Sequence, residues 1–197
     1  LELGAVDFIR KPYNVRIVKG KINSVIKLRE SAIVLSALEY DELTGLYIRQ
    51  AFFHHAKTLM RVKNDQKFHV VVADVKNFKW INGTYGEKTG DQVLAYLGDA
   101  YKKQVHSEMV ARYGGDQFVA IVYGDLNLAE EKVEAAIHRI AERAPISNLA
   151  VNYGIYENVD KTLPLTLICD RAFLAMKSIQ NDYEHSFAFY DEEMGRK

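Results

Sequence analysis

Two aspartates occupy positions that suggest a role in binding a cation or a nucleotide. Asp74 lies near the end of the apolar run 68–75, and Asp116 directly follows Gly114 and Gly115. A carboxylate that ends a buried strand is costly unless it binds a cation or accepts hydrogen bonds. If the two converge, they offer the hard oxygen ligands that Mg²⁺ prefers, and the glycines let a nucleotide approach the backbone. A lone Gly-Gly-Asp sequence is more often an ordinary hairpin turn, so the pattern alone leaves both interpretations open.

The elements that must position these carboxylates follow from the hydrophobic pattern. Strands are predicted at 68–75, 109–112, 118–123, 149–156 and 186–190, and helices at 14–39, 49–62, 90–104, 126–143 and 163–179. The strands at 109–112 and 118–123 form a tight hairpin around the glycine pair. Strands alternating with helices predict an α/β fold in which helices flank a mixed central sheet.

The first 39 residues divide into two expected segments. Residues 14–39 predict a long amphipathic helix with Asn14 as its N-cap, typical of a connector or a dimer seam. Residues 1–13 resemble the tail of a response-regulator receiver domain through the pattern Gly4-Ala5-x-Asp7-Phe8-Ile9-x-Lys11-Pro12. The alternative is an ordinary strand and turn. The receiver resemblance implies that the chain is a piece of a longer protein.

Four segments resemble, in order and spacing, the motifs of the GGDEF family, the fold of the diguanylate cyclases. They are the opening motif at 41–46, a metal and guanine segment at 74–94, the signature RYGGDQF at 112–118, and the closing helix at 170–177. The resemblance implies a GGDEF domain over residues 40–197. The segment from 169 to 191 also resembles GGDEF domains that continue into an EAL phosphodiesterase domain.

The resemblance implies a role for each matching residue. Asp74, the carbonyl of Val75, and Asp116 would hold Mg²⁺, with Asp116 and Gln117 at the catalytic position. In the family reaction, the 3′-hydroxyl of each of two GTP molecules attacks the α-phosphate of the other. The products are cyclic di-GMP and two pyrophosphates. Each domain holds one GTP, so the resemblance also implies a homodimer.

The remaining implied roles concern the nucleotide. Asn82 and Asp91 would read the Watson–Crick edge of guanine, although both could instead cap helices. Leu43 and Leu94 would flank the base, with a plain core position as the alternative. The other substrate-binding positions implied are the backbone amides of Phe78 and Lys79, the Lys177 ammonium, and the glycine pair Gly114 and Gly115.

The sequence departs from the family at several positions. Gln117 replaces a glutamate, and Lys76 replaces a second aspartate on the same strand face as Asp74. Losing a carboxylate and gaining an ammonium both weaken a divalent-cation site. The other departures are Glu87 for a histidine, Asn181 for an arginine, and Val105 with Glu108 where the product-inhibition motif would fall. They predict a degenerate domain with a weak or absent Mg²⁺ site.

Composition narrows the functional classes further. The 197 residues carry 26 basic and 26 acidic side chains, so no net field favours nucleic acid or an anionic membrane. No apolar run approaches the roughly 20 residues of a membrane helix. Cys169 is the only cysteine, which suits a reducing, cytoplasmic setting.

Three functions remain open on these grounds. The first is a degenerate GGDEF module in cyclic di-GMP signalling that binds GTP and relays a signal without catalysis. The second is an active diguanylate cyclase that tolerates Gln117, and the third is a ligand-free dimerisation spacer. Intact Asn82 and Asp91 favour binding over the spacer, whereas Lys76 and Gln117 disfavour the enzyme.

Overall fold

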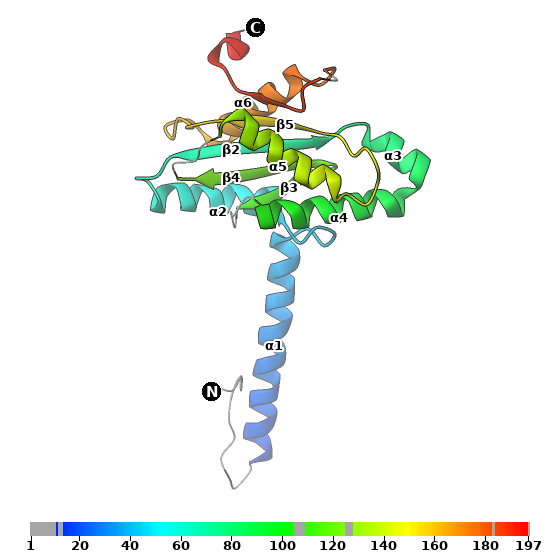
Figure 1. Ribbon diagram of the computed structural model, residues 1–197. Coiled ribbons are helices and arrows are strands. Elements are labelled where there is room, and N and C mark those ends of the chain that lie inside the picture. Colours follow the sequence, from blue (N-terminus) through cyan, green and yellow to red (C-terminus); the bar gives the residue numbers. More distant parts are fainter. Residues whose placement is uncertain (1–10, 12–13, 105–108, 125–127, 183, 197) are drawn as a thin grey trace. The chain divides into compact units, whose positions relative to one another are not determined.

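The structure is a computed structural model that describes residue 11 and residues 14–104, 109–124, 128–182 and 184–196. The helices are α1 (Val15–Glu39), α2 (Arg49–Val62), α3 (Phe78–Tyr85), α4 (Glu87–Gln104), α5 (Glu130–Glu142), α6 (Leu165–Ser178) and the short 3-10 helix η1 (Glu192–Arg196). The strands are β1 (Tyr47–Ile48), β2 (Phe68–Val75), β3 (Val110–Gly114), β4 (Gln117–Tyr123), β5 (Val151–Tyr156) and β6 (Phe187–Phe189). Figure 1 shows these elements along the chain.

The chain divides into two compact units, Leu1–Glu39 and Tyr40–Lys197. In the first, α1 is a single helix of 25 residues. Asn14 caps it as predicted, because its side-chain oxygen accepts the Arg16 N–H at 2.9 Å. Large apolar side chains along α1 are exposed, among them Ile22, Ile26 and Ile33. An exposed apolar surface on a long helix is typical of a coiled-coil partner.

The second unit is built on one mixed sheet of six strands in the order β1-β3-β4-β2-β5-β6. β2 pairs antiparallel with both β4 and β5, whereas β1 with β3 and β5 with β6 are parallel pairs. β2 therefore lies at the centre of the sheet, which explains why its eight residues are mostly apolar. Two polar residues interrupt β2, His69 near its start and Asp74 near its end.

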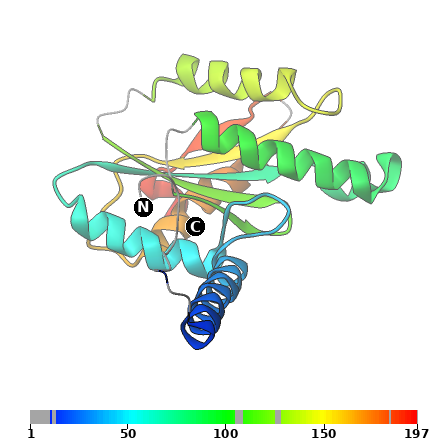
Figure 2. The ribbon, with the colours of Figure 1, turned by 90° about the horizontal axis from the view of Figure 1, so that it is seen from below.

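Helices cover both faces of this sheet. One core joins α2 and α6 to the face that carries Val70 and Val72, and a second joins α3, α4 and α5 to the face that carries Ala73 and Val75. Figure 2 shows α4 and α5 on one side of the sheet and α2 on the other. The predicted α/β class, a mixed sheet between helices, is confirmed.

The structure differs from the predicted elements mainly at their ends and in three short elements. α3, β1 and η1 were not predicted, and α4 begins at Glu87 instead of residue 90. α3 has only eight residues and contains Asn82, Gly83 and Thr84, which are weak helix formers. The predicted receiver-like tail lies outside the described residues apart from residue 11.

Candidate functional site

The two aspartates predicted from the sequence lie near one another at one end of the central strands. Asp74 is the seventh residue of β2, and Asp116 lies in the turn between β3 and β4. Burial, and after it the Asp74 carboxylate, raise the pKa of Asp116, while Arg112 and Lys79 act in the opposite direction. A carboxylate close enough to disfavour the ionisation of its neighbour is the arrangement that a bound cation relieves.

Gln117 holds the Asp74 carboxylate directly. The two residues are paired across β2 and β4, and Gln117 Nε2 donates to Asp74 Oδ1 at 3.0 Å. An amide can donate this bond, whereas the glutamate that the family has here would place a second negative charge beside Asp74. This hydrogen bond occupies Oδ1 of Asp74, a predicted metal ligand.

The candidate ligands are of the kind that magnesium prefers, but they carry less negative charge than the family's site because Gln117 replaces a glutamate. Asp74, Asp116 and the Val75 carbonyl are hard oxygen ligands, and Mg²⁺ commonly uses one or two carboxylates together with substrate phosphates. Among the residues that the structure describes, no three His, Cys, Asp or Glu side chains form a cluster that could hold a metal. An ion here would take its remaining ligands from water or from phosphate oxygens.

Lys76 lies just beyond the last residue of β2. Its ammonium donates to the carbonyl of Asp182 at 2.7 Å, in the segment after α6. The ammonium expected on the same strand face as Asp74 is thus bound to the main chain of that segment. Lys177, predicted to face the phosphates, is exposed in the last turn of α6.

The predicted guanine readers lie on two successive helices. Asn82 belongs to α3 and Asp91 to α4, with a break at Gly86, whose φ is +87°. Asn82 Oδ1 is buried, and no donor in the described part of the chain reaches it. Asp91 is exposed. A buried amide oxygen without a donor is costly. The N–H groups of guanine are donors that would remove this cost if the side chains covering the oxygen move to admit the base.

Gly90 explains how the Asn82 amide fits between the helices. A Cβ added at Gly90 would overlap Asn82 Oδ1 and would lie 3.2 Å from the ring of Phe78. Only glycine therefore leaves the Asn82 side chain its present position. This close approach could not be seen in the sequence, where Gly90 is simply one motif glycine.

The other predicted substrate residues divide into two groups. Phe78 and Lys79 begin α3 after Asn77, whose φ is +55°, so their N–H groups belong to the first helical turn, where an anion can bind. Leu43 is partly buried, but Leu94 is only 1% exposed and belongs to the core. A contact of Leu94 with a base would require neighbouring side chains to move.

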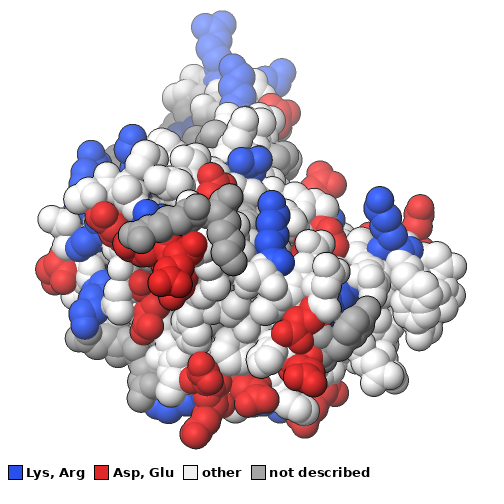
Figure 3. Space-filling model, turned by 90° about the horizontal axis from the view of Figure 1, so that it is seen from above, with Lys and Arg blue, Asp and Glu red and all other residues white. Residues whose placement is uncertain are grey.

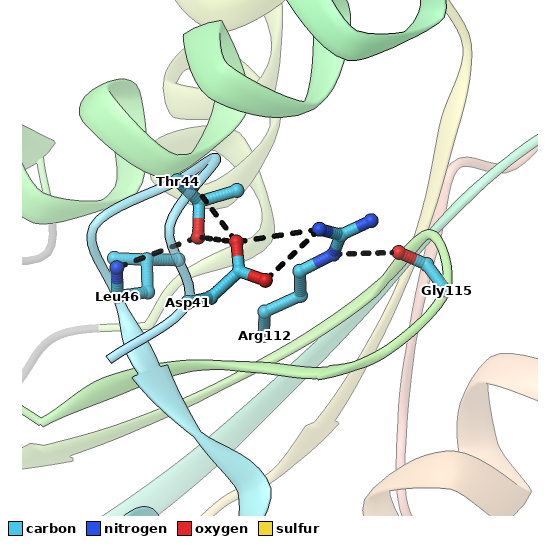
Figure 4. Close-up of polar contacts among 5 residues, drawn as sticks. All are labelled: Asp41, Thr44, Leu46, Arg112 and Gly115. Atoms are coloured by element: carbon cyan, nitrogen blue, oxygen red, sulfur yellow. Dashed lines mark hydrogen bonds and ion pairs between the residues drawn. The ribbon is translucent and has the colours of Figure 1, made fainter. Parts of the chain in front are cut away.

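A polar network ties the opening motif to the signature hairpin (Figure 4). Arg112 Nη1 donates to Asp41 Oδ2 at 3.0 Å, and Arg112 Nε donates to the Gly115 carbonyl at 2.8 Å. Thr44 donates to Asp41 Oδ1 from its N–H at 2.9 Å and from its hydroxyl at 2.7 Å. Arg112 thus fixes the glycine turn of the hairpin relative to the turn at residues 41–46.

We expect this network to make stability depend on pH. Burial acts to raise the pKa of Asp41, but the hydrogen bonds from Thr44 and the Arg112 guanidinium outweigh it and hold the pKa below its ordinary value of 3.8. A carboxyl with a lowered folded pKa stabilises fully above its unfolded pKa and loses that contribution as pH falls through the folded value.

Asp41→Asn should therefore cost about 2 kcal/mol at neutral pH, and this difference should shrink as pH falls below about 4. Urea unfolding of both proteins between pH 2.5 and 7 measures the effect. A difference that stays constant over this range would contradict the ionic part of the network.

Asn152 is a site residue that the motifs did not indicate. It pairs with Asp74 across β2 and β5, so Gln117, Asp74 and Asn152 form one cross-strand row. Asn152 is 3% exposed, and its Oδ1 has no partner among the described residues. The available signal was a lone amide within the otherwise apolar strand 149–156.

The distribution of surface charge and the hydropathy of the helices agree with the balanced composition of the chain. Figure 3 shows acidic and basic side chains scattered over the face seen from above, separated by broad areas without charged groups. No helix within the described ranges is both long and apolar enough to cross a bilayer.

Comparisons with known proteins connect this geometry to a family. The family model described as diguanylate cyclase, GGDEF domain, matches residues 38–183. Diguanylate cyclase DgcS of Shewanella oneidensis is 30% identical over 141 residues, which cover 63% of this chain and 48% of DgcS. Diguanylate cyclase DgcP of Escherichia coli is 32% identical over 121 residues, covering 57% of this chain and 36% of DgcP. The chain thus spans about half or less of these relatives.

Solved structures show the same fold. The coiled coil and GGDEF domain of DgcB from Caulobacter crescentus, in complex with c-di-GMP, superposes with a TM-score of 0.70 at 23% identity, covering 88% of this chain and 97% of that one. The S helix–GGDEF–EAL structure of Vibrio cholerae LapD gives a TM-score of 0.64 at 18% identity, covering 83% and 39%. With the family model matching most of its length, the chain belongs to the GGDEF family of cyclic di-GMP signalling.

Proposed function

We propose that this GGDEF domain binds GTP selectively through guanine and relays a signal without making cyclic di-GMP. The observation that carries the proposal is the hydrogen bond from Gln117 Nε2 to Asp74 Oδ1. The neutral amide satisfies one oxygen of Asp74 and adds no negative charge where the family has a glutamate. With one carboxylate fewer, the site attracts a divalent cation more weakly.

The nucleotide half of the site supports binding. The buried, unpartnered Asn82 Oδ1 and the exposed Asp91 carboxylate are acceptors, and guanine presents donors at its ring nitrogen and its amino group. Adenine presents a lone pair at the corresponding ring nitrogen, which would face the Asp91 carboxylate. The first-turn N–H groups of α3 and the Lys177 ammonium supply contacts for phosphates.

We expect GTP to bind at least about tenfold more tightly than ATP, because a buried polar group left unpaired costs about 1–3 kcal/mol. Asp91→Ala should remove most of this preference. Binding should change little when a chelator replaces Mg²⁺. Calorimetric titration of both nucleotides, with and without chelator, measures all three effects.

Asp99→Ala is the matched control, since Asp99 is an exposed α4 aspartate whose hydrogen-bond partner is Lys103. It should leave the preference unchanged. Equal affinity for the two nucleotides, or an unaffected Asp91→Ala variant, would remove the guanine site. A strict Mg²⁺ requirement would favour the active cyclase instead.

Incubation of the chain with GTP and Mg²⁺ should give no cyclic di-GMP above the control without protein. The double change Lys76→Asp and Gln117→Glu should tighten Mg²⁺ binding at least about tenfold, because it puts a second carboxylate against Asp74, adds another just after β2 and removes one ammonium. Chromatography detects the product, and calorimetry gives the metal affinity.

Gln117→Leu provides the control, because it removes the hydrogen bond without adding charge. It should not tighten Mg²⁺ binding. Robust turnover by the unmodified chain would overturn the proposal and establish the cyclase alternative. An unchanged Mg²⁺ affinity in the double variant would refute the electrostatic explanation, whatever the activity.

The proposal extends to partners. The exposed apolar side chains of α1 support a homodimer through this helix. An upstream receiver domain and a downstream EAL domain would place the module within a response regulator, as the sequence resemblances imply. The cyclase alternative is supported by the named relatives, which are themselves diguanylate cyclases. Absence of GTP binding, together with dimerisation, would identify a spacer.

A further inference from the structure

The Lys76 side chain begins beside the expected phosphate site, but its charged end is bound elsewhere. Lys76 directly follows β2, two residues after Asp74, and the first turn of α3 begins two residues later at Phe78. The Lys76 ammonium donates to the main-chain carbonyl of Asp182 at 2.7 Å, although the two residues are 106 positions apart in the chain. A cation that starts between Asp74 and the N–H groups of α3 is therefore held by a neutral group.

Asp182 builds the turn that holds Lys76. Its N–H donates to the Ile179 carbonyl at 3.0 Å, so the turn directly follows the C-cap of α6. Its Oδ1 accepts the N–H groups of Glu184 at 2.7 Å and of His185 at 3.1 Å, and its Oδ2 lies 2.7 Å from His185 Nδ1. One side chain thus closes the turn with three contacts, while the main-chain carbonyl of the same residue accepts Lys76.

The turn is charged at its centre and attached to the sheet at its far end. The hydrogen bond from the Glu184 N–H, followed by those from His185, lowers the pKa of Asp182 to about 2, so its carboxylate is ionised at neutral pH. Beyond His185, the Ser186 carbonyl accepts the N–H of Tyr153 in β5 at 2.8 Å. The acceptor for Lys76 is therefore kept in place by α6 on one side and by β5 on the other.

We propose that Asp182 is a positioning residue that holds the Lys76 ammonium away from a bound nucleotide. With the turn closed, the phosphates meet Lys177 and the first-turn N–H groups of α3, and Lys76 stays on the Asp182 carbonyl. Opening the turn releases the ammonium, which then donates to a phosphate oxygen in a charge-assisted hydrogen bond. The turn thereby sets the affinity for the triphosphate without affecting guanine recognition. This inference rests on the GTP binding proposed above.

Acetylation of the Lys76 amine by acetic anhydride tests the turn without any nucleotide. Asp182→Ala removes all three side-chain contacts and should speed the acetylation of Lys76 about fivefold, because the hydrogen bond to the carbonyl favours the unreactive ammonium. Lys57, an exposed lysine of α2, should react at the same rate in both proteins. Peptide mass spectrometry at a low extent of reaction measures both rates.

Calorimetric titration with GTP and with guanosine then separates the phosphates from the base. Asp182→Ala should tighten GTP binding about fivefold and leave guanosine binding unchanged, because guanosine has no phosphate. His185→Ala removes part of the turn and should act in the same direction by about twofold. Adding Lys76→Met to Asp182→Ala should cancel the gain in GTP affinity.

Asp160→Ala is the matched control, because Asp160 closes a similar turn away from Lys76. Asp160 Oδ1 accepts the Thr162 N–H at 2.9 Å, in the segment beyond the opposite end of β5. Asp160→Ala should change neither the acetylation of Lys76 nor the GTP affinity. Asp182→Asn keeps an oxygen that accepts the N–H groups of the turn, and it should behave like the parent.

Unaltered acetylation of Lys76 in an Asp182→Ala variant that circular dichroism shows to be folded would overturn the proposal. A gain in GTP affinity that persists with Lys76→Met, or an equal gain for guanosine, would also overturn it. Faster acetylation of Lys76 in Asp182→Ala, together with no GTP binding by the parent, would overturn the proposed function instead and support Asp182 as the residue that holds Lys76.

Discussion

Gly154→Ala is expected to lower the free energy of unfolding by about 3 kcal/mol or more. A Cβ at this position in β5 would overlap the Ala172 carbonyl oxygen and would lie 2.7 Å from the Met176 nitrogen. Both atoms belong to the backbone of α6, so a side-chain rotation cannot relieve the overlap. The helix must move away from the sheet, and the densely packed core loses contacts. Urea unfolding followed by circular dichroism measures the loss.

The same displacement would affect the site, because α6 carries Lys177 and leads to the segment that holds Lys76. Gly83→Ala serves as the comparison. A Cβ at Gly83, on α3, meets nothing within 4 Å, and alanine is the better helix former by about 1 kcal/mol. It should therefore raise stability. If Gly154→Ala unfolds at the parent urea concentration, the close approach of α6 to β5 is wrong.

Gly90→Ala is expected to remove the discrimination between GTP and ATP while the fold survives. The added Cβ would overlap Asn82 Oδ1 and would lie 3.0 Å from Asn82 Cγ. Because the obstacle is the end of a side chain, Asn82 can rotate away, and the domain loses its reader instead of its packing. We expect at least about tenfold weaker GTP binding, from the loss of a contact worth 1–3 kcal/mol.

Calorimetry with GTP and ATP, beside the unfolding curve, separates the two effects of Gly90→Ala. Gly83→Ala is again the matched control. Gly83 directly follows Asn82 in α3, and its substitution should leave nucleotide binding unchanged. Unaltered GTP affinity in a folded Gly90→Ala variant would show that Asn82 does not need its present position, and would contradict its role as a reader.

The sequence predicted elements that are long or strongly patterned. Helix 49–62 and strand 68–75 have the bounds predicted, because α2 has a clear apolar face and β2 is apolar on both faces at the centre of the sheet. The eight-residue α3 was missed because its residues favour a helix weakly. Contacts with α4 stabilise it instead, and these are tertiary.

For the site, the sequence by itself determined the types of chemical group. It gave two carboxylates for a metal, an amide with a carboxylate for guanine, and a glutamine where the family has glutamate. Only the tertiary structure decided their partners. The bond of Gln117 to Asp74, the ion pair of Arg112 with Asp41, and the Lys76 contact with Asp182 join residues at least 43 positions apart. Strand register and helix packing set such contacts, and no local pattern encodes them.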